Sequence, residues 1–458
     1  MSVHSDFRSG HHFRAAIISQ GDEIVLGQTL DTNSKWLADQ LLARGITPVE
    51  QVSLPDDVPA ITAAFRRLSA SVDLILCTGG LGPTADDLTR EALAAAEGDT
   101  LVEDPAALAQ IERWFKDRGR PMPVINRVQA MRPRSATTIE NFHGTAPGIQ
   151  ARVGGADVFC MPGPPRELFP MFEEQVAFLL RPPTARSVRT LALHIVGLGE
   201  SDVATSLSKA PGGDMMARER VPLVGTTASG GVVTARIRYE GPLPASDADA
   251  LVRRTADQVR SLLGAHVFAE NGTPHEELPA AVIEALRERG RTLAVVESCT
   301  AGLLGSMIGD IPGASGVFLG GVITYANALK SSLAGVPAAI FEGPASPGSV
   351  SFECASAMAI GGLRATGATD CLSITGIAGP GGATPTKPVG TVFIALATSG
   401  TTGVTVDARR FNMAGDRRSV REWSARAAMA MLWMRMSGAP ETRLLREVDR
   451  RASEQCEQ

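Results

Sequence analysis

The sequence has little of several residue types and patterns on which common protein classes depend. Its six cysteines show no Cys-x-x-Cys spacing, and its seven histidines do not cluster apart from His11 and His12. We therefore expect neither a disulfide framework nor a zinc centre built from protein ligands alone. No apolar run approaches the roughly 18 residues of a membrane span, and the first residues lack the apolar core of a secretory signal. We therefore expect a cytoplasmic protein that does not associate with a membrane.

An excess of positive charge is also missing. The 458 residues carry 44 basic and 49 acidic side chains, a formal net charge of −5. Proteins that bind nucleic acid usually present clustered positive charge, so no nucleic-acid partner is expected. Lysine is rare among the basic residues, and arginine supplies the rest. A buried lysine can lose its proton whereas arginine in practice cannot, so each lysine merits inspection as a base. The five lysines are Lys35, Lys116, Lys209, Lys330 and Lys387.

Apolar runs and amphipathic segments divide the chain into three folded regions, as its length predicts. Residues 1–180 alternate strand-like runs with amphipathic helices, which is typical of a parallel sheet covered on both faces. Residues 188–270 follow a Pro/Arg-rich linker and carry the hairpin and helix signals of a small α+β domain. Residues 275–437 are again α/β. The charged end, residues 438–458, is predicted to be a solvated helix or a frayed tail.

A hydroxyl and a thiol stand side by side at a junction in the last region. In the stretch VESCTAGLLGSMIG a strand is expected to end at Glu297 and a helix to start near Thr300, which places Ser298 between them. The free N–H groups and the dipole of that helix would hold a developing oxyanion, with Ser298 as the nucleophile. Cys299 is the competing nucleophile, because thiol pKa values fall at helix starts. The structural alternative is that Ser298 or Thr300 only caps the helix.

Tyr325 and Lys330 follow the next strand signal, in the segment TYANALK. A serine nucleophile needs a base, and the last region has no histidine beyond His275. A lysine whose ammonium form is destabilised by burial is therefore the available candidate, and the Tyr325 hydroxyl would relay the proton or donate to an oxyanion. The alternative is a core tyrosine and a surface lysine whose stem lies along the protein.

A loop rich in glycine and proline follows another strand, in SITGIAGPGGATPTKPVGTV, residues 373–392. Successive N–H groups in such a turn can bind an anion, and Lys387 with Arg417 and Arg418 would complete a pocket for one phosphate. The spacing fits neither a Walker A loop nor a dinucleotide fingerprint, and a plain surface loop is the alternative.

Two loops of the first region suit a phosphate group. LILCTGGLGPTADDLTREAL places glycines between a strand and a helix, and MPGPPREL follows a second strand. Backbone N–H groups would bind the phosphate, Asp86 would hold a divalent metal that bridges to it, and both loops would line one crevice. Helix capping by Asp86 is the alternative. The residues expected to contact this ligand are Gly79, Gly80, Gly82, Thr84 and Gly163.

Taken in order, these motifs resemble those of the competence/damage-inducible CinA family over nearly the whole chain. The first region is similar to the molybdopterin-binding (MoaB/MogA-like) fold through GDEIVLG, DTNSKWLADQL, TGGLGPTADDLTR, NFHGTAPG and MPGPPREL. The last region resembles the CinA C-terminal domain through ESCTAGLLGSMIGDIPGASGVFLGGVITYANALK, SITGIAGPGGATPTKPVGTV and GDRRSVR. The resemblance implies an α/β protein with an N-terminal molybdopterin-binding-like parallel sheet domain, a small α+β middle domain and a C-terminal α/β amidase domain.

The same resemblance implies two activities in pyridine nucleotide recycling. The last region would hydrolyse nicotinamide mononucleotide to nicotinate mononucleotide and ammonia without a cofactor, with Ser298 as nucleophile, Lys330 as general base and Tyr325 as assisting hydroxyl. The first region would be an ADP-ribose pyrophosphatase that depends on a divalent metal at Asp86. The residues expected around the amide substrate are Thr300, Thr375, Gly376, Gly379, Gly381, Lys387 and Arg417.

Two other classes of function stay open at this point. The chain could be a diphosphate hydrolase whose last region only binds a ligand, or a non-catalytic interaction protein linked to competence or DNA damage. Metal dependence separates the first of these from a Ser/Lys amidohydrolase, which needs no metal. Small nucleotides are the expected binding partners, and a homodimer is the default state for a soluble oligomer.

Overall fold

The computed structural model describes residues 10–455 apart from residues 185 and 402. The chain divides into two compact units, which we call the N-terminal unit (residues 1–189 and 239–250) and the C-terminal unit (residues 190–238 and 251–458). None of the helices in the described residues is long and apolar enough to cross a bilayer.

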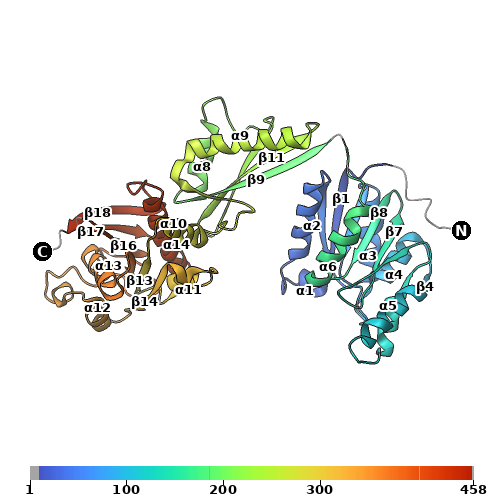
Figure 1. Cartoon of the computed structure of the whole chain (residues 1–458), viewed down its shortest axis with the longest axis horizontal. Helices are drawn as coiled ribbons and strands as arrows, with labels where there is room; N and C mark the ends of the chain where they lie inside the picture. Colours follow the sequence, from blue (N-terminus) through green and yellow to red (C-terminus); the bar gives the residue numbers. More distant parts are fainter. Residues whose placement is uncertain (1–9, 185, 402, 456–458) are drawn as a thin grey trace. The chain divides into compact units, whose positions relative to one another are not determined.

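A six-stranded sheet in the order β2-β1-β3-β8-β7-β6 forms the centre of the N-terminal unit (Figure 1). Strands β2, β1, β3 and β8 are parallel, whereas β7 and β6 join antiparallel at one edge. Alternate residues of β1 face opposite cores, Ala16 and Ile18 on one side and Ala15 and Ile17 on the other. The strands are β1 (Arg14–Gln20), β2 (Thr47–Leu54), β3 (Leu74–Thr78), β6 (Thr137–Ile139), β7 (Gly148–Val153) and β8 (Ala156–Met161).

Helices cover both faces of this sheet, as the sequence pattern predicts. One core includes residues of α3 and α4, and the opposite core includes residues of α2 and α6. A short pair, β4 (Leu101–Glu103) and β5 (Met131–Pro133), lies apart from the main sheet. The helices are α1 (Asp22–Val25), α2 (Thr32–Ala43), α3 (Val58–Ser69), α4 (Thr89–Glu97), α5 (Pro105–Lys116), α6 (Pro165–Met171) and α7 (Ala177–Leu179).

The middle region is a four-stranded sheet in the order β10-β11-β9-β12 with two helices, the α+β arrangement expected from the sequence. Strands β10 and β11 pair antiparallel, as do β12 and β9. The elements are β9 (Ser187–Val196), α8 (Glu200–Ser208), β10 (Leu223–Ser229), β11 (Val232–Gly241), α9 (Ala245–Leu263) and β12 (Val267–Glu270).

The last region is built on a second six-stranded sheet, in the order β14-β13-β15-β16-β17-β18 (Figure 1). Strands β14, β13 and β15 are parallel, and β16, β17 and β18 extend the sheet antiparallel. The strands are β13 (Leu293–Glu297), β14 (Phe318–Ile323), β15 (Asp370–Gly376), β16 (Thr391–Gly400), β17 (Gly403–Asn412) and β18 (Glu447–Gln455).

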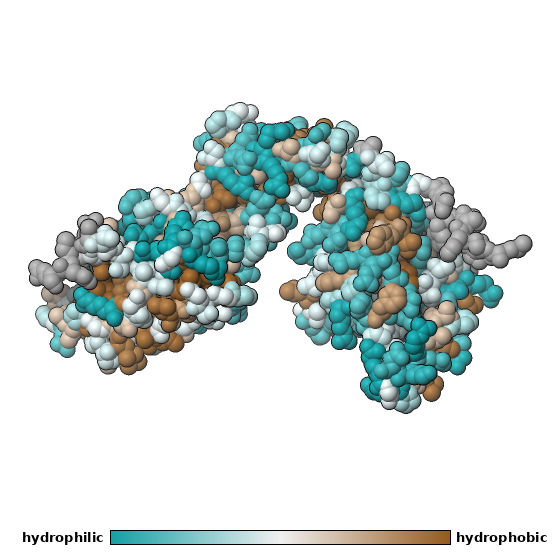
Figure 2. All heavy atoms as spheres, viewed as in Figure 1, coloured by the Kyte–Doolittle hydropathy of each residue, from teal (hydrophilic) through white to brown (hydrophobic). Residues whose placement is uncertain are grey.

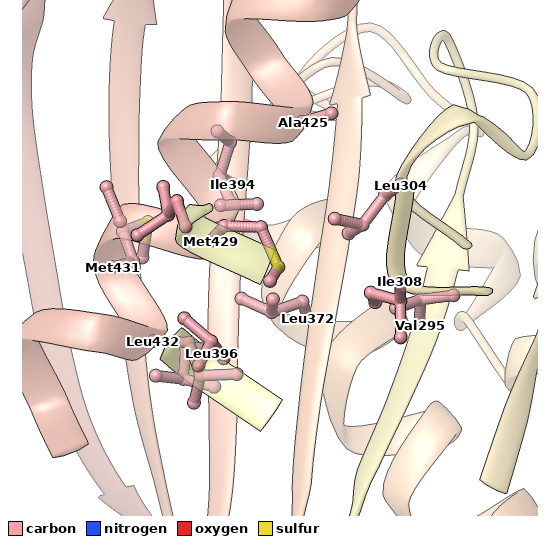
Figure 3. Packing of buried hydrophobic residues seen from close by; sticks show 14 of the residues in the cluster. Val295, Leu304, Ile308, Leu372, Ile394, Leu396, Ala425, Met429, Met431 and Leu432 are labelled. Atoms are coloured by element: carbon pink, nitrogen blue, oxygen red, sulfur yellow. The ribbon is translucent and has the colours of Figure 1, made fainter. Parts of the chain in front are cut away.

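Two apolar cores sandwich this sheet. Figure 3 shows the core in which Met429 and Leu432 of the long helix α14 lie close to Ile394 and Leu396 of β16. Leu304 of α11 packs in the same core, and α13 covers the opposite face. These layers confirm the predicted α/β class. The helices are α10 (Leu278–Glu288), α11 (Leu303–Gly309), α12 (Asn327–Ala334), α13 (Phe352–Thr366) and α14 (Arg417–Met436).

The charged end of the chain differs from the expected helix or frayed tail. Its residues form β18, which pairs with β17. The charges are neutralised within the sheet, since fully buried Arg409 contacts Glu447 at 2.9 Å and Asp407 at 2.8 Å, and Arg450 contacts Asp407 at 2.7 Å. A charge-rich segment can therefore be structural when its partners lie on the neighbouring strand, and sequence spacing did not reveal those partners.

Candidate active sites

The C-terminal unit brings Ser298 and Lys330 into contact. Ser298 directly follows β13, and Lys330 lies in the first turn of α12, which comes after β14. Because β13 and β14 are parallel neighbours, their carboxyl ends lie at the same edge of the sheet. The Nζ atom of Lys330 is 3.0 Å from the Oγ atom of Ser298, a hydrogen-bonding distance across 32 positions of sequence.

Lys330 is buried among uncharged groups. Its side chain is 2% exposed, and Nζ also lies 2.9 Å from the carbonyl oxygen of Thr324 and 3.3 Å from that of Tyr325. Burial lowers the pKa of Lys330 below the ordinary lysine value, because the ammonium form loses its hydration. A neutral amine can donate its two N–H groups to the two carbonyls and accept the Ser298 hydroxyl proton on its lone pair. The geometry therefore suits proton abstraction from Ser298.

Cys299 is a poor competitor for the role of nucleophile. Its side chain is buried, and that burial raises the pKa of the thiol to about 12. The thiol is therefore protonated near neutral pH, and the protonated form is not the nucleophilic one. The expected lowering of this pKa by a helix start is wrong, because the helix begins four residues later, at Leu303.

The junction after β13 is held by Glu297 rather than by a hydroxyl. A turn occupies residues 298–302, and the carboxylate of Glu297, which is 1% exposed, points into the start of α11. It accepts three hydrogen bonds of 2.8–3.1 Å from the backbone N–H groups of Gly302, Leu304 and Gly305. Capping by Ser298 or Thr300 is therefore wrong. The predicted oxyanion site at the N-terminus of α11 is wrong for the same reason, since Glu297 already occupies these donors.

Tyr325 contacts the candidate site in two ways. Its backbone carbonyl faces Lys330, while its hydroxyl accepts a hydrogen bond of 2.6 Å from Arg417. Arg417 also donates to the carbonyl oxygen of Gly379 at 2.7 Å. Tyr325 is 53% exposed, so the core-tyrosine alternative is wrong. Arg417 thus links the Tyr325 hydroxyl to the loop rich in glycine and proline.

The other residues expected around this ligand fall into two groups. Thr375 and Gly376 make contacts within the protein. The Thr375 hydroxyl donates to the Ser349 carbonyl, and a Cβ on Gly376 would lie 2.7 Å from the Val392 side chain. Gly379 and Gly381 lie in the loop, and a Cβ on Gly381 would meet open space.

The three cations proposed for a phosphate pocket do not converge. The Lys387 ammonium donates to the Pro347 carbonyl at 2.9 Å, and Arg418 pairs with Glu422 along α14. Of the three, Arg417 alone contacts both the loop and Tyr325. Thr300 is fully buried and its hydroxyl has no hydrogen-bond partner among the described residues, while its carbonyl accepts from Arg421.

A cavity of about 610 Å³ lies at the carboxyl edge of the parallel strands in the N-terminal unit. The two predicted loops line it together, as do parts of the segments GDEIVLG and DTN. Asn33 links the two loops, because its side-chain amide donates to the Gly163 carbonyl of one at 2.7 Å and to the hydroxyl of Thr78, which precedes the other, at 3.2 Å. The lining residues that the sequence pointed to are Gly79, Gly80, Gly82, Asp86 and Gly163.

The glycine-rich loop is fixed by charged side chains of its own segment. Asp87 accepts hydrogen bonds from the backbone of Gly82 at 2.7 Å and of Thr84 at 2.8 Å, and the Thr84 hydroxyl donates to it as well. Thr84 therefore stabilises the loop and is not among the cavity-lining residues. Arg90, which is buried, donates to the carbonyls of Leu81 and Gly82.

Glycine is required where the loop passes Gln20. A Cβ on Gly79, whose φ is +100°, would lie 2.5 Å from the Gln20 carbonyl oxygen. A Cβ on Gly80 would lie 2.3 Å from the side chains of Gln20 and Thr89. A larger residue would displace the loop from the cavity wall.

Carboxylates that line the cavity can accommodate a divalent metal only together with a ligand. Within the described residues no group of three or more His, Cys, Asp or Glu side chains could hold an ion by itself. Asp56, Asp87 and Glu167 accept hydrogen bonds within the protein, which leaves Asp86 and Glu23 to face a ligand. One or two carboxylates plus phosphate oxygens and water is a set that Mg²⁺ accepts. Asp86 does not cap α4, whose N-cap residue is Leu88.

Sequence reasoning missed the residues that hold both sites. Glu297 and Arg90 were not singled out, and the contact of Gln20 with Thr89 was not expected, although each of the three is a polar residue at the end of a strand or at the start of a helix behind a motif. Their signal in the sequence is position alone. Only the structure shows that they are buried and bonded to loop backbone or to a neighbouring hydroxyl.

Comparison with known proteins covers nearly the whole chain in three parts. Residues 275–436 match the family model of the CinA C-terminal domain, residues 16–182 that of the "Probable molybdopterin binding domain", and residues 190–269 that of the damage-inducible protein CinA KH domain. A CinA-like protein of Anaeromyxobacter sp. is 41% identical over 421 residues, which cover 91% of this chain and 97% of the relative. A CinA-like protein of Citrifermentans bemidjiense is 39% identical over 423 residues, which cover 92% and 97%.

Among solved structures, the crystal structure of the protein CinA from Thermoplasma acidophilum covers 37% of this chain and 99% of its own. Its sequence identity is 34% and its TM-score 0.35.

The Glu297 cap predicts a specific stability change. We expect Glu297→Gln to lower the free energy of unfolding by about 1–3 kcal/mol, because an amide offers one acceptor oxygen where a carboxylate offers two. The change is measured as a lower melting temperature by circular dichroism. Glu288→Gln is the matched control, since that side chain is 65% exposed beside Arg289 and such pairs contribute little. Equal melting temperatures for the two variants would show that the cap carries no stability.

Proposed function

The chain belongs to the CinA family, and on that premise we propose that its C-terminal unit is an amidohydrolase that converts nicotinamide mononucleotide to nicotinate mononucleotide and ammonia. The observation that supports this proposal is the 3.0 Å contact between Ser298 and buried Lys330. A hydroxyl hydrogen-bonded to an amine with a lowered pKa is one arrangement that activates a nucleophile for acyl transfer.

The reaction proceeds by two acyl transfers. Neutral Lys330 takes the Ser298 proton as Oγ attacks the carboxamide carbon, and the resulting ammonium gives that proton to the departing nitrogen, so that ammonia leaves and an ester on Ser298 remains. Water then attacks the ester and loses a proton to Lys330, which returns it to Oγ as the carboxylic acid leaves. The acid releases its own proton to solvent and becomes the carboxylate product. The carbonyls of Thr324 and Tyr325 hold the amine in place and stabilise its transient positive charge.

The exposed side of the site suits the rest of the nucleotide. Arg417 presents a guanidinium that can bind a phosphate in bidentate fashion, next to the loop of Gly379 and Gly381. The Tyr325 ring is half exposed and offers a face for a planar heterocycle. Lys387 would contribute only after releasing the Pro347 carbonyl.

Removal of either member of the Ser298–Lys330 pair tests the amidohydrolase proposal. We expect Ser298→Ala and Lys330→Met each to lower kcat for ammonia release by about 10³-fold or more, because the two groups act as one unit. Cys299→Ala keeps most of the rate, since its thiol is protonated.

The matched control for the lysine variant is Lys35→Met, because the side chain of Lys35 is 80% exposed. Circular dichroism of each variant separates loss of chemistry from loss of fold. Loss of activity in Cys299→Ala together with an active Ser298→Ala would assign the nucleophile to the thiol instead.

The pH dependence follows from the lowered pKa of Lys330. The base must be neutral, so kcat/KM for ammonia release is expected to rise with pH and to level off above an apparent pKa that lies below the ordinary lysine value of 10.5. Below that pKa the rate falls about tenfold per pH unit. Steady-state rates across the pH range measure it. Lys330→Arg, which stays charged, should be inactive at every pH, and a wild-type rate that declines as pH rises would contradict a neutral amine as base.

The cavity of the N-terminal unit supports a second activity, and we propose that this unit hydrolyses the diphosphate of ADP-ribose. Its volume of about 610 Å³ is in the range of small-ligand sites. The backbone of Gly79–Gly82 would bind the diphosphate, and Asp86 with Glu23 would hold a divalent ion together with its oxygens. Such an ion supplies Lewis-acid stabilisation of the phosphoryl oxygens.

The two proposed activities are separable. Asp86→Ala, or a chelator such as EDTA, is expected to remove AMP release from ADP-ribose and to leave ammonia release from nicotinamide mononucleotide unchanged. Ser298→Ala should give the reverse pattern, which makes each variant the control for the other. Loss of both activities with chelator would contradict a metal-free amidohydrolase, and AMP release that survives in Asp86→Ala would remove Asp86 from the metal site.

A further inference from the structure

The hairpin of β10 and β11 in the middle region ends against α14 of the last region. Gly230 and Gly231 form its two-residue turn, which we call the hairpin tip, with φ angles of +56° and +84° that favour glycine. A Cβ on Gly231 would lie 2.8 Å from the ring of Trp423. A Cβ on Gly230 would lie 3.1 Å from the guanidinium of Arg426. The hairpin tip therefore contacts α14 closely, and a side chain at Gly231 would displace one of the two.

The hairpin tip belongs to a continuous packed interface within the C-terminal unit. Phe268 of the middle region lies in the same buried cluster as Met429 of α14, and Val232, beside the tip, packs against that cluster. The indole N–H of Trp433 donates to the carbonyl oxygen of Ala265 at 2.7 Å. Figure 2 shows hydrophobic residues where these two regions meet and hydrophilic ones along α9. The middle region is therefore fixed against α14 at more than one point.

Another face of α14 contacts the candidate amidase site. Arg417 and Arg421 are four residues apart and share one face of the helix. Arg417 contacts the loop rich in glycine and proline, and Arg421 donates to the carbonyl oxygen of Thr300 at 2.7 Å. Trp423 follows Arg421 by two residues, which is about 200° around an α-helix, so it lies on the opposite side. The helix thus stands between the hairpin tip and the loops of the site.

We propose that the hairpin tip positions Arg417 for the phosphate of the nucleotide substrate. The tip packs on one side of Trp423, and the guanidinium of Arg446 lies 4.1 Å from the centroid of the same ring. These contacts fix α14, and with it the guanidinium at its first residue. Gly231 and Trp423 are positioning residues, because they act on the ligand through Arg417. The inference rests on the proposed amidase function, since the phosphate is that of its substrate.

The reacting groups depend less on α14 than Arg417 does. Ser298 and Lys330 stand next to β13 and on α12, and Glu297 holds the turn after β13 through three hydrogen bonds of its own. Arg417 reaches the site as part of α14. A displaced α14 is therefore expected to weaken binding of the nucleotide and to leave the chemical step nearly unchanged.

The variant Gly231→Ala tests the contact, because its methyl group would overlap the ring of Trp423. We expect KM for ammonia release from nicotinamide mononucleotide to rise about fivefold, with kcat within about twofold of wild type. Trp423→Leu, which removes the ring that the tip covers, should give the same pattern. Gly212→Ala is the matched control, since Gly212 also has a positive φ of +97° but a Cβ there would meet open space. Circular dichroism and melting confirm that each variant is folded.

A double-mutant cycle shows whether the hairpin tip acts through Arg417. If it does, Gly231→Ala raises the KM of Arg417→Met by less than about twofold, because the phosphate contact is already lost. A role in stability alone would multiply the two effects. The same four proteins are compared by isothermal titration calorimetry with nicotinate mononucleotide, which needs no catalysis. A wild type that binds this nucleotide but releases no ammonia would end the amidase assignment, and the four dissociation constants would still decide the role of the tip.

Unchanged KM and affinity in both Gly231→Ala and Trp423→Leu would overturn the proposal. So would multiplied effects in the cycle, an equal rise of KM in Gly212→Ala, or a loss of kcat at constant KM, because each places the effect elsewhere than at Arg417. A wild type without affinity for either nucleotide would overturn both this inference and the proposed amidase function.

Discussion

The contact between a buried amine and a hydroxyl is the constraint on which the C-terminal site depends. Lys330 has no opposite charge among its hydrogen-bonding partners, which are two backbone carbonyls and Ser298. An ammonium ion in that position loses most of its hydration, which lowers the pKa of Lys330 and makes its neutral form, the form that can act as a base, easier to reach. Burying Lys330 in this way costs folding free energy. The burial of apolar side chains in the two cores around the sheet offsets that cost.

Both units place their candidate sites in the same way. Each site lies at the carboxyl edge of parallel strands, where loops from neighbouring strands converge. In each, buried charged side chains bind loop backbone, Glu297 behind Ser298 in one unit and Arg90 behind the glycine turn in the other. These two side chains hold the loops through backbone hydrogen bonds. The groups that face the ligand are therefore not needed to hold the loops in place.

Much of the architecture could be predicted from the periodicity of apolar residues and from the residues that begin and end helices and strands. The long final helix runs from Arg417 to Met436 with Asp416 as its N-cap, and it carries the start signal and recurring apolar residues on which such predictions depend. The alternation of apolar runs and amphipathic helices predicted the α/β class of the first and last regions, and hairpin and helix signals predicted the α+β class of the middle one. Prediction failed where distant partners decide the outcome. The charge of the last segment suggested that solvent surrounds it. In the structure Glu447 of β18 forms an ion pair with buried Arg409 of the neighbouring strand β17.

By itself, the sequence determined the family, the α/β class, and the short list of hydroxyl, amine and carboxylate groups that could act. It did so because motifs and periodicity are local properties of the chain. Only the tertiary structure decided which of these groups meet. It placed Lys330 against Ser298, left Cys299 with a thiol pKa of about 12, and used Glu297 instead of a hydroxyl to cap α11. Burial and long-range contact set these outcomes, and neither is encoded in spacing along the chain.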